Sequence, residues 1–432
     1  ASTLVEVLNW HAAAHPERPH IRLYSDDGDG EVITYRALKE GAERVAAGLV
    51  RLGFEPGEAV VVMLPTGRDY FLTFFGVLLA GGVPVPIYPP ARAAHIEEHL
   101  RRHAAIVANC RGAVMVTVAE AQPVARLLRS QVDTLRHVVT PDQLVEAPGG
   151  FAMPVLGAGD TAFLQYTSGS TGDPKGVVLS HANLLANIRV MGEVLEVGPD
   201  DVFVSWLPLY HDMGLIGAWL GSLHFAVPLV IMSPLAFLAR PRRWLWAMHR
   251  YRGTLSAAPN FAYELCLRRI SDADIEGLDL SSWRMAANGA EAVSPETMER
   301  FCARFKAHGF QRAAMMPMYG LAENSVGLAF TPLGRGPLVD RVERRALSEL
   351  GHAVPARAGD ESALAIVACG RPLPGHQVRI VDPGGRELPE RREGQLQFEG
   401  PSSTSGYFRN ADATRGLFQG EWLDSGDLAY VA

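Results

Sequence analysis

The stretch "LQYTSGSTGDPKG" occupies residues 164–176 and combines glycines, hydroxyl side chains and one lysine. Glycines let backbone N–H groups approach an anion closely, hydroxyl groups donate hydrogen bonds, and Lys175 supplies a positive charge. The flanking segments TAFLQY and GVVLS are typical of strands. We therefore expect a phosphate-binding loop held between two strands, although composition alone also permits a Ser/Gly-rich surface loop.

This stretch does not have the spacing of a Walker-type phosphate loop. That loop needs a glycine, four further residues and then Gly-Lys-Ser/Thr. Counted from Gly169, the second glycine is replaced by Pro174, and counted from Gly172 the lysine comes too early. The phosphate site must therefore belong to another class.

The composition is that of a globular protein with more than one packed unit. The chain has 432 residues, of which 48% are hydrophobic and 20% charged, and its formal net charge is −7. A chain of this length exceeds one ordinary core. The negative charge disfavours a general nucleic-acid binder, and we interpret the basic cluster at 240–244 as a solvated helix face.

The cysteines and the apolar runs bear on the cellular location. Cys110, Cys266, Cys302 and Cys369 are widely separated and form no CxxC pair, which predicts neither a zinc site nor a disulfide framework and favours the cytoplasm. The longest apolar run, residues 70–87, contains glycines and prolines in its second half. We expect a buried helix and a short strand there, not a membrane span.

Strand-like runs alternate with helical patterns through the first three quarters of the chain. Residues 294–296, Ser-Pro-Glu, are typical of a helix start. The alternation predicts an α/β fold with two βαβ-type subdomains and mostly parallel sheets over residues 1–330. The runs that predict buried strands are 58–64, 112–118, 201–207 and 227–232.

The composition and the hydrophobic pattern of the sequence change after residue 330. Residues 333–362 are polar and rich in glycine and proline. Two strand-like segments follow at 376–388 and 394–401, with a Pro-Gly-Gly turn between them. We expect a smaller β-rich subdomain, a distorted barrel, over residues 369–432.

The string YTSGSTGDPKG closely resembles the signature loop of adenylate-forming enzymes, the group that contains acyl-CoA synthetases, luciferases and peptide-synthetase adenylation domains. The resemblance implies an AMP-binding large domain that spans residues 1–432. Four further segments resemble other motifs of that family in the same order: SWLPLYHDMGLIG (205–217), ANGAEAV (287–293), MYGLAE (318–323) and WLDSGDLAY (422–430).

The resemblance implies activation of a carboxylic acid by ATP with Mg²⁺. Glu323 is the implied Mg²⁺ ligand, Tyr319 is expected to stack on adenine, and Asp427 to accept hydrogen bonds from the ribose. Lys175, His211 and Glu323 are the candidate catalytic residues. The implied nucleotide contacts are Thr167, Ser168, Gly169, Ser170, Thr171, Gly172, Lys175, Asn288, Gly289, Ala290, Glu291, Tyr319, Gly320 and Asp427.

Taken singly, each of these residues also has a structural explanation. Glu323 could simply begin a helix, Asp427 could form an Asx turn, and His211 could be an ordinary core histidine. The presence of five motifs in one order favours the functional interpretation.

Two features of the motifs indicate which acid is activated. Amino-acid adenylation domains resemble a pattern with Phe-Asp where this chain has Tyr210-His211, and Pro317 and Ala322 also depart from that pattern. The segments YHDMGLIG, VPIYPP (85–90) and NGAE look like those of fatty acyl-AMP ligases. The expected substrate contacts are His211, Met213, Ile216 and Phe261, with plain core packing as the alternative for the apolar ones.

The polar segment at 336–368 resembles an insertion of the fatty acyl-AMP ligases, although it could also be a variable surface loop. The resemblance implies that the acyl group passes to the phosphopantetheine arm of an acyl carrier protein, in lipid, polyketide or lipopeptide biosynthesis. A fatty acyl-CoA synthetase and a non-catalytic module that binds nucleotide or acyl-adenylate are the alternatives.

Members of this family continue into a small C-terminal domain that carries a catalytic lysine. No such segment follows Asp427 here. We therefore expect this sequence to be the large domain of a longer protein, and no residue of it is a candidate for that lysine.

Overall fold

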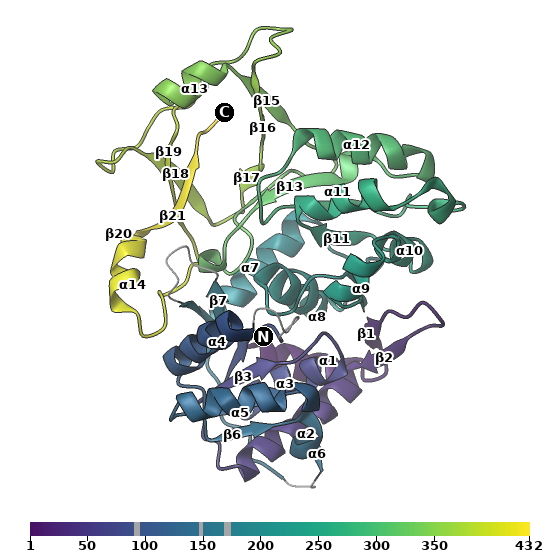
Figure 1. Cartoon of the computed structure of the whole chain (residues 1–432), viewed down its shortest axis with the longest axis vertical. Helices are drawn as coiled ribbons and strands as arrows, with labels where there is room; N and C mark the ends of the chain where they lie inside the picture. Colours follow the sequence, from purple (N-terminus) through teal and green to yellow (C-terminus); the bar gives the residue numbers. More distant parts are fainter. Residues whose placement is uncertain (90–95, 147–149, 168–173) are drawn as a thin grey trace.

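The computed structural model describes residues 1–89, 96–146, 150–167 and 174–432 (Figure 1). One parallel and one mixed sheet with their helices form the larger part of the molecule, and a smaller antiparallel part packs at one end. The α/β fold predicted from the alternating pattern is confirmed. Within these residues, no helix is both long enough and apolar enough to cross a membrane.

The first sheet is four-stranded and fully parallel, in the order β4-β3-β5-β6. Every residue of β3 is buried, as the continuous apolar run at 58–64 predicts for a parallel strand covered on both faces. Each fully buried valine of this kind contributes about 1.5–3 kcal/mol to stability. The strands are β3 (Ala59–Met63), β4 (Val83–Pro86), β5 (Val114–Thr117) and β6 (His137–Val139). The helices of this region are α2 (Tyr35–Arg51), α3 (Arg68–Leu79), α4 (Ile96–Cys110), α5 (Gln122–Gln131) and α6 (Pro141–Val145).

The long apolar run at 70–87 forms α3 and β4, as predicted. Ten consecutive residues of α3 are buried, from Tyr70 to Leu79. The helix ends before Gly81, whose φ of +75° lies in the left-handed region that glycine adopts without strain. The chain then enters β4 directly.

The second sheet has nine strands in the order β17-β14-β13-β12-β11-β9-β10-β1-β2. Its centre is parallel, whereas β2 at one edge and β14 and β17 at the other are antiparallel, so the sheet is mixed. The strands are β1 (Pro19–Leu23), β2 (Glu31–Thr34), β9 (Phe203–Ser205), β10 (Leu229–Ile231), β11 (Leu255–Ala258), β12 (Met285–Asn288), β13 (Met315–Tyr319), β14 (Ala329–Phe330) and β17 (Arg371–Pro372). The helices around this sheet are α1 (Leu4–Ala14), α7 (His181–Val194), the π-helix η3 (Met213–Leu220), α8 (Gly221–Phe225), α9 (Pro234–Ala239), α10 (Arg242–Arg250), α11 (Asn260–Arg269) and α12 (Pro295–Phe305).

Capping side chains fix the starts of two of these helices. At α12 the hydroxyl oxygen of Ser294 accepts a hydrogen bond from the backbone N–H of Thr297, as the Ser-Pro-Glu pattern predicts. At α7, Ser180 accepts from the backbone N–H of Asn183, whose side chain bonds back to the backbone of Ser180. This capping box sets the direction in which α7 leaves the preceding strand.

That strand belongs to a two-stranded antiparallel hairpin, β7 (Thr161–Thr167) and β8 (Lys175–Ser180). Residues 168–173, the centre of the signature stretch, connect the two strands and lie outside the described residues. The two flanking strands predicted from the sequence are thus present.

The β-rich part is an antiparallel sheet in the order β18-β19-β21-β20 that curls into a half-barrel. The segments predicted as a pair of strands do pair, with Gln377 opposite Glu399 and Val381 opposite Gln395. The elements are β18 (Gln377–Val381), β19 (Gly394–Glu399), α14 (Ala411–Leu417), β20 (Phe418–Gln419) and β21 (Trp422–Ala429).

Residues 336–368 hold β15 (Val339–Val342), α13 (Arg344–Leu350) and β16 (Leu364–Val367). β15 and β16 form a separate antiparallel pair with a small core around Val342, Leu347 and Ala353. In Figure 1 this unit lies beside the half-barrel. Its interpretation as an insertion, and the proposed domain boundaries, remain predictions.

Candidate active site

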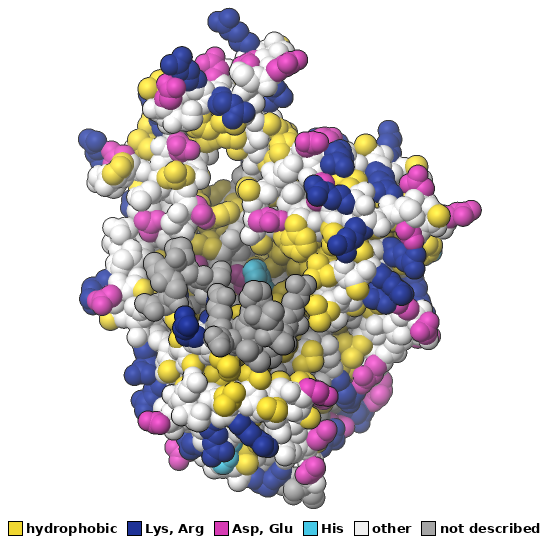
Figure 2. Space-filling model, viewed as in Figure 1, with side chains coloured by type: hydrophobic (Ala, Val, Ile, Leu, Met, Phe, Trp, Pro, Cys, Tyr) yellow, Lys and Arg dark blue, Asp and Glu magenta, His cyan; other side chains and the backbone are white. Residues whose placement is uncertain are grey.

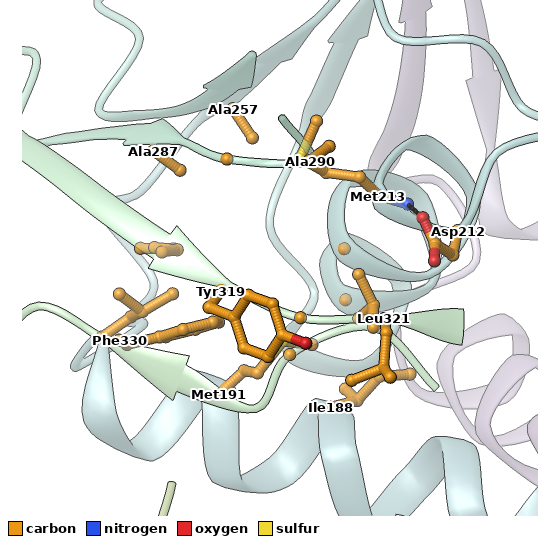
Figure 3. A pocket seen from close by; sticks show the side chains of 18 of the residues that line it. Ile188, Met191, Asp212, Met213, Ala257, Ala287, Ala290, Tyr319, Leu321 and Phe330 are labelled. Carbon is orange, nitrogen blue, oxygen red and sulfur yellow. Dashed lines mark hydrogen bonds between the residues drawn. The ribbon is translucent and has the colours of Figure 1, made fainter. Parts of the chain in front are cut away.

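A cavity of about 740 Å³ lies along β11, β12 and β13 and is also lined by residues of α7, η3 and β21. On the face shown in Figure 2 the surface is hollowed near its centre, with hydrophobic side chains above the hollow and to its right. Figure 3 shows Tyr319 with Ile188 and Met191 of α7 on one side and Ala257 and Ala287 on the other. The predicted site residues that line the cavity are Thr167, His211, Met213, Gly289, Ala290, Tyr319, Gly320, Glu323 and Asp427.

Tyr319 at the end of β13 and Asp427 in β21 are joined across the cavity wall. The tyrosine hydroxyl donates to Oδ2 of Asp427 at 2.6 Å. Burial raises the pKa of Tyr319, and the neighbouring carboxylate of Asp427 raises it further. The phenol therefore stays protonated and keeps Asp427 in place beside the nucleotide motifs.

Glu323 and Lys175 are linked through a third residue, Tyr407. Its hydroxyl donates to Oε1 of Glu323 at 2.7 Å, and Nζ of Lys175 lies 5.3 Å from the centre of its ring. A cation above an aromatic ring at this distance is attracted by the ring. Burial raises the pKa of Tyr407, followed by the charge of Glu323, so this hydroxyl also remains a donor.

Tyr407 was not predicted from the sequence, because no motif that we recognised contains it. It reaches the site because its segment runs along β8: the N–H of Phe408 donates to the carbonyl of Gly176 at 2.7 Å, and the N–H of Val178 donates to the carbonyl of Gly406 at 3.0 Å. The backbone pairing thus brings a distant tyrosine next to the signature hairpin.

His211 and Asp212 form an ion pair at the start of η3, with 2.7 Å between Nδ1 and Oδ1. The charge of Asp212 raises the pKa of His211, against the effect of burial. Asp212 also accepts a hydrogen bond of 2.6 Å from the N–H of Met213 and so caps the π-helix. Asp212 lines the cavity but was not among the predicted site residues.

Two motif glycines are required by close backbone approach. A Cβ atom on Gly320 would lie 1.7 Å from the carbonyl oxygen of Val326, and one on Gly289 would lie 2.7 Å from that of Met318. Neither site can hold a larger residue without backbone movement. The first approach folds the segment after β13 onto itself, and the second brings the loop after β12 against β13.

The remaining predicted residues lie elsewhere. Asn288 is buried and its amide nitrogen contacts Oδ1 of Asn260 at 3.3 Å. Glu291 accepts from the backbone N–H of Phe261 at 2.6 Å, and the Phe261 side chain is exposed. Ile216 is fully buried and does not line the cavity. The residues Ser168, Gly169, Ser170, Thr171 and Gly172 lie outside the described part of the chain.

Much of the cavity wall is apolar, and most of the apolar residues that line it were not predicted to be site residues. The sequence pattern of α7 indicates only that one face of the helix is apolar. The pattern is the same whether that face packs in a core or lines a cavity. The apolar and small residues that line the cavity besides those predicted include Ile188, Met191, Gly192, Leu195, Val197, Phe203, Gly217, Gly221, Phe225, Val227, Leu255, Ala257, Met285, Ala287, Met318, Leu321, Val326 and Phe330.

The residues present suit a Mg²⁺ ion held jointly with phosphate. Within the described ranges, no group of three or more His, Cys, Asp or Glu side chains could hold a metal ion by itself. Mg²⁺ in nucleotide-dependent enzymes is commonly held by one or two carboxylates together with phosphate oxygens and water. Glu323, which lines the cavity, could provide such a carboxylate.

This arrangement is that of an adenylate-forming enzyme: a mixed α/β large domain with a half-barrel, and residues from all five motifs lining one cavity. The sequence profile of the AMP-binding enzymes matches residues 8–408. The chain therefore belongs to the family of AMP-binding enzymes, which are ATP-dependent adenylating ligases.

Two relatives with similar sequences carry names that refer to fatty-acid or acyl activation. The medium-chain-fatty-acid–[acyl-carrier-protein] ligase JamA of Moorena producens is 33% identical over 440 residues, covering 100% of this chain and 74% of the relative. A protein of Caulobacter vibrioides, provisionally named an acyl-CoA synthetase, is 31% identical over 431 residues, covering 99% of this chain and 74% of the relative.

Solved structures show the same relationship. One from a study of fatty acyl-adenylate ligases of E. coli and L. pneumophila superposes with a TM-score of 0.95 at 33% identity, covering 100% of this chain and 77% of that one. The L. pneumophila fatty acyl-adenylate ligase in complex with acyl adenylate and pyrophosphate gives a TM-score of 0.91 at 31% identity, covering 100% and 76%.

Proposed function

We propose that this protein is a fatty acyl-AMP ligase, which converts a fatty acid and ATP to acyl-adenylate and pyrophosphate. The observation that carries this proposal is the apolar cavity that continues from the nucleotide motifs. Tyr319 and Asp427 line one part of it, whereas Leu195, Val197 and Phe225 line another. An apolar channel of this kind matches an alkyl chain, because burying methylene groups is favourable.

In the proposed reaction, a carboxylate oxygen of the fatty acid attacks the α-phosphorus of ATP. The new P–O bond forms as the bond to the departing pyrophosphate breaks, which leaves a mixed acyl-phosphate anhydride. Lys175 and the loop at 167–172 bind the departing phosphates and stabilise their developing charge, and Asp427 orients the ribose. His211, beside Asp212, borders the position of the acid.

Glu323 would hold the Mg²⁺ ion of this reaction, with Tyr407 keeping its carboxylate in position through the 2.7 Å hydrogen bond. Bound Mg²⁺ would neutralise charge on the phosphate oxygens. Because Tyr407 also contacts Lys175, one side chain positions two charged groups at the same phosphates.

We propose an acyl carrier protein as the acceptor of the acyl group. Support comes from JamA, whose name specifies that acceptor, and from the folded unit at 336–368, whose sequence resembles an insertion of the fatty acyl-AMP ligases. Transfer to CoA is the second candidate, because the Caulobacter relative bears an acyl-CoA synthetase name. The cytoplasmic location remains a prediction.

The test uses the enzyme in its longest natural form, with ATP, Mg²⁺ and fatty acids of increasing length. CoA and a phosphopantetheine-bearing carrier protein are offered separately as acceptors. We expect acyl-AMP with fatty acids and acyl transfer to the carrier protein only. Efficient formation of acyl-CoA would favour the synthetase, and the absence of any pyrophosphate release would show a non-catalytic binding module.

A further inference from the structure

One helical segment, η3 followed by α8, runs along the cavity from its polar end. Met213, Gly217, Gly221 and Phe225 succeed one another at intervals of four residues, and all four line the cavity. Residues at this spacing share one face of a helix. The segment spans at most roughly 18 Å between Met213 and Phe225 at the rise of an α-helical residue. Gly217 therefore lies about a third of the way along this wall.

Gly217 leaves free space that no neighbouring part of the protein occupies. A Cβ atom built on Gly217 meets no atom within 4 Å, and one on Gly221 meets only the carbonyl oxygen of Ile216, at 3.5 Å. Glycine inside a helix lowers helix stability relative to alanine. Packing within the protein therefore gives no reason for glycine at position 217.

Gly214, three residues earlier in the same segment, shows the opposite situation. A Cβ atom there would lie 2.3 Å from the carbonyl oxygen of Pro208. Gly214 is thus required by contact with the chain before the helix, and it does not line the cavity. The contrast indicates that the space at Gly217 serves what enters the cavity.

The walls around this space are apolar. Met191 of α7, Leu195 just after this helix and Leu255 of β11 line the cavity with Gly217. At the end of α8, the ring of Phe225 packs directly on Gly192 of α7, where a Cβ atom would lie 2.1 Å from the ring. The two helices therefore touch at Phe225, whereas no such contact fills the space at Gly217.

We propose that Gly217 determines the length of the acyl chain that this enzyme accepts, because its missing side chain leaves the channel open between the polar end and Phe225. The inference rests on the proposed function, since it concerns the acyl part of the same site. A side chain at position 217 would project into the channel and stop longer chains there, while shorter chains would still be bound.

The test measures binding to the 432-residue chain, so it does not depend on turnover. The probes are N-acylsulfamoyl adenosines, stable analogues of acyl-AMP, with acyl groups from acetyl to palmitoyl, and calorimetry gives the dissociation constants. Affinity of the unmodified chain should rise about fourfold for each methylene buried, until the channel is filled. In Gly217→Leu the increase in affinity with chain length should stop at a shorter acyl group. The affinity for the longest analogues should fall at least tenfold relative to that for the acetyl analogue.

In Gly217→Ala the affinity should also stop rising at a shorter acyl group than in the unmodified chain, but at a longer one than in Gly217→Leu. Because its Cβ meets no atom within 4 Å, this variant tests the proposal even if leucine destabilises the helix. The matched control is Gly416→Leu on the exposed surface of α14, where a Cβ also meets no atom within 4 Å. This control should keep the length profile of the unmodified chain.

The outcomes separate the two proposals. If both Gly217 variants fold and retain the original length profile, the assignment of Gly217 is wrong although the proposed function stands. If affinity of the unmodified chain does not rise with acyl length, the proposed fatty acyl function itself is wrong.

Discussion

The hydroxyl group of Tyr407 donates a 2.7 Å hydrogen bond to Oε1 of Glu323, from a position 84 residues further along the chain. The same ring lies 5.3 Å from Nζ of Lys175. The candidate phosphate-binding cation and the candidate metal-binding carboxylate are thus positioned by one side chain. Three of our predictions concern this cluster and its neighbour Asp427.

Lys175→Ala and Glu323→Ala should each lower the rate of acyl-AMP formation about a hundredfold, because each removes a group that stabilises phosphate charge in the transition state. Pyrophosphate release measures the rate, and circular dichroism with thermal melting shows whether the variants remain folded. Unchanged acyl-AMP formation in both folded variants would contradict the proposed site.

Tyr407→Phe removes the hydrogen bond to Glu323 but keeps the ring next to Lys175. A hydrogen bond to a charged group contributes about 1.5–3 kcal/mol, so we expect the Mg²⁺ concentration for half-maximal activity to rise about tenfold. Tyr407→Leu removes the ring as well and should reduce activity further. An identical Mg²⁺ dependence in Tyr407→Phe and the unmodified enzyme would show that Tyr407 does not position Glu323.

Asp427→Asn should weaken binding of ATP about tenfold, because hydrogen bonds from the ribose to a carboxylate are replaced by weaker ones to an amide. Titration calorimetry with ATP measures this change directly. Tyr319→Phe, which loses the 2.6 Å bond to Asp427 but keeps the ring and the Asp427 carboxylate, should have a smaller effect. The reverse order of the two effects would contradict a direct ribose contact by Asp427.

Gly320→Ala should destabilise the fold by about 3 kcal/mol, because an added Cβ atom 1.7 Å from the carbonyl oxygen of Val326 forces the backbone to move. Urea unfolding measures the loss. Gly416→Ala in the exposed helix α14 is the control and should be neutral or slightly stabilising. Equal stabilities of the two variants would contradict the close approach at Gly320.

Asp212→Asn should lower the pKa of His211, because the charge of Asp212 is the largest cause of its raised pKa. In the unmodified protein the raised pKa means that protonated His211 stabilises the fold below the ordinary histidine pKa. This contribution is lost as the pH rises through the raised value. NMR titration of the imidazole checks the shift, and an unchanged pKa would show that Asp212 is not its cause.

The buried strands were predictable because parallel strands covered on both faces need continuous apolar runs, as at β3 and β5. The start of α12 was predictable because Ser294 caps it locally. The short strands β14 and β17, the last two at one side of the nine-stranded sheet, were not predicted. Each has only two residues, and the partner strand, not a local pattern, determines their pairing.

In the candidate site, too, features set by local sequence were predicted and features set by contacts between distant segments were missed. The motif residues Tyr319, Glu323 and Asp427 were found from their local sequence, and the structure places all three along one cavity. Tyr407 was missed because its contact with Glu323 depends on pairing between distant segments. Ile216 and Phe261 were predicted to contact substrate, but the structure places them outside the cavity lining.

The segment HDMGLIGAWLG (residues 211–221) shows most clearly what the sequence determined and what the tertiary structure determined. The sequence by itself was enough to indicate an adenylate-forming enzyme, because the five motifs that resemble this family are short and local. Only the tertiary structure distinguished Gly214 from Gly217. Gly214 meets the backbone of Pro208, whereas Gly217 faces open space, and this difference comes entirely from what the fold places opposite each residue.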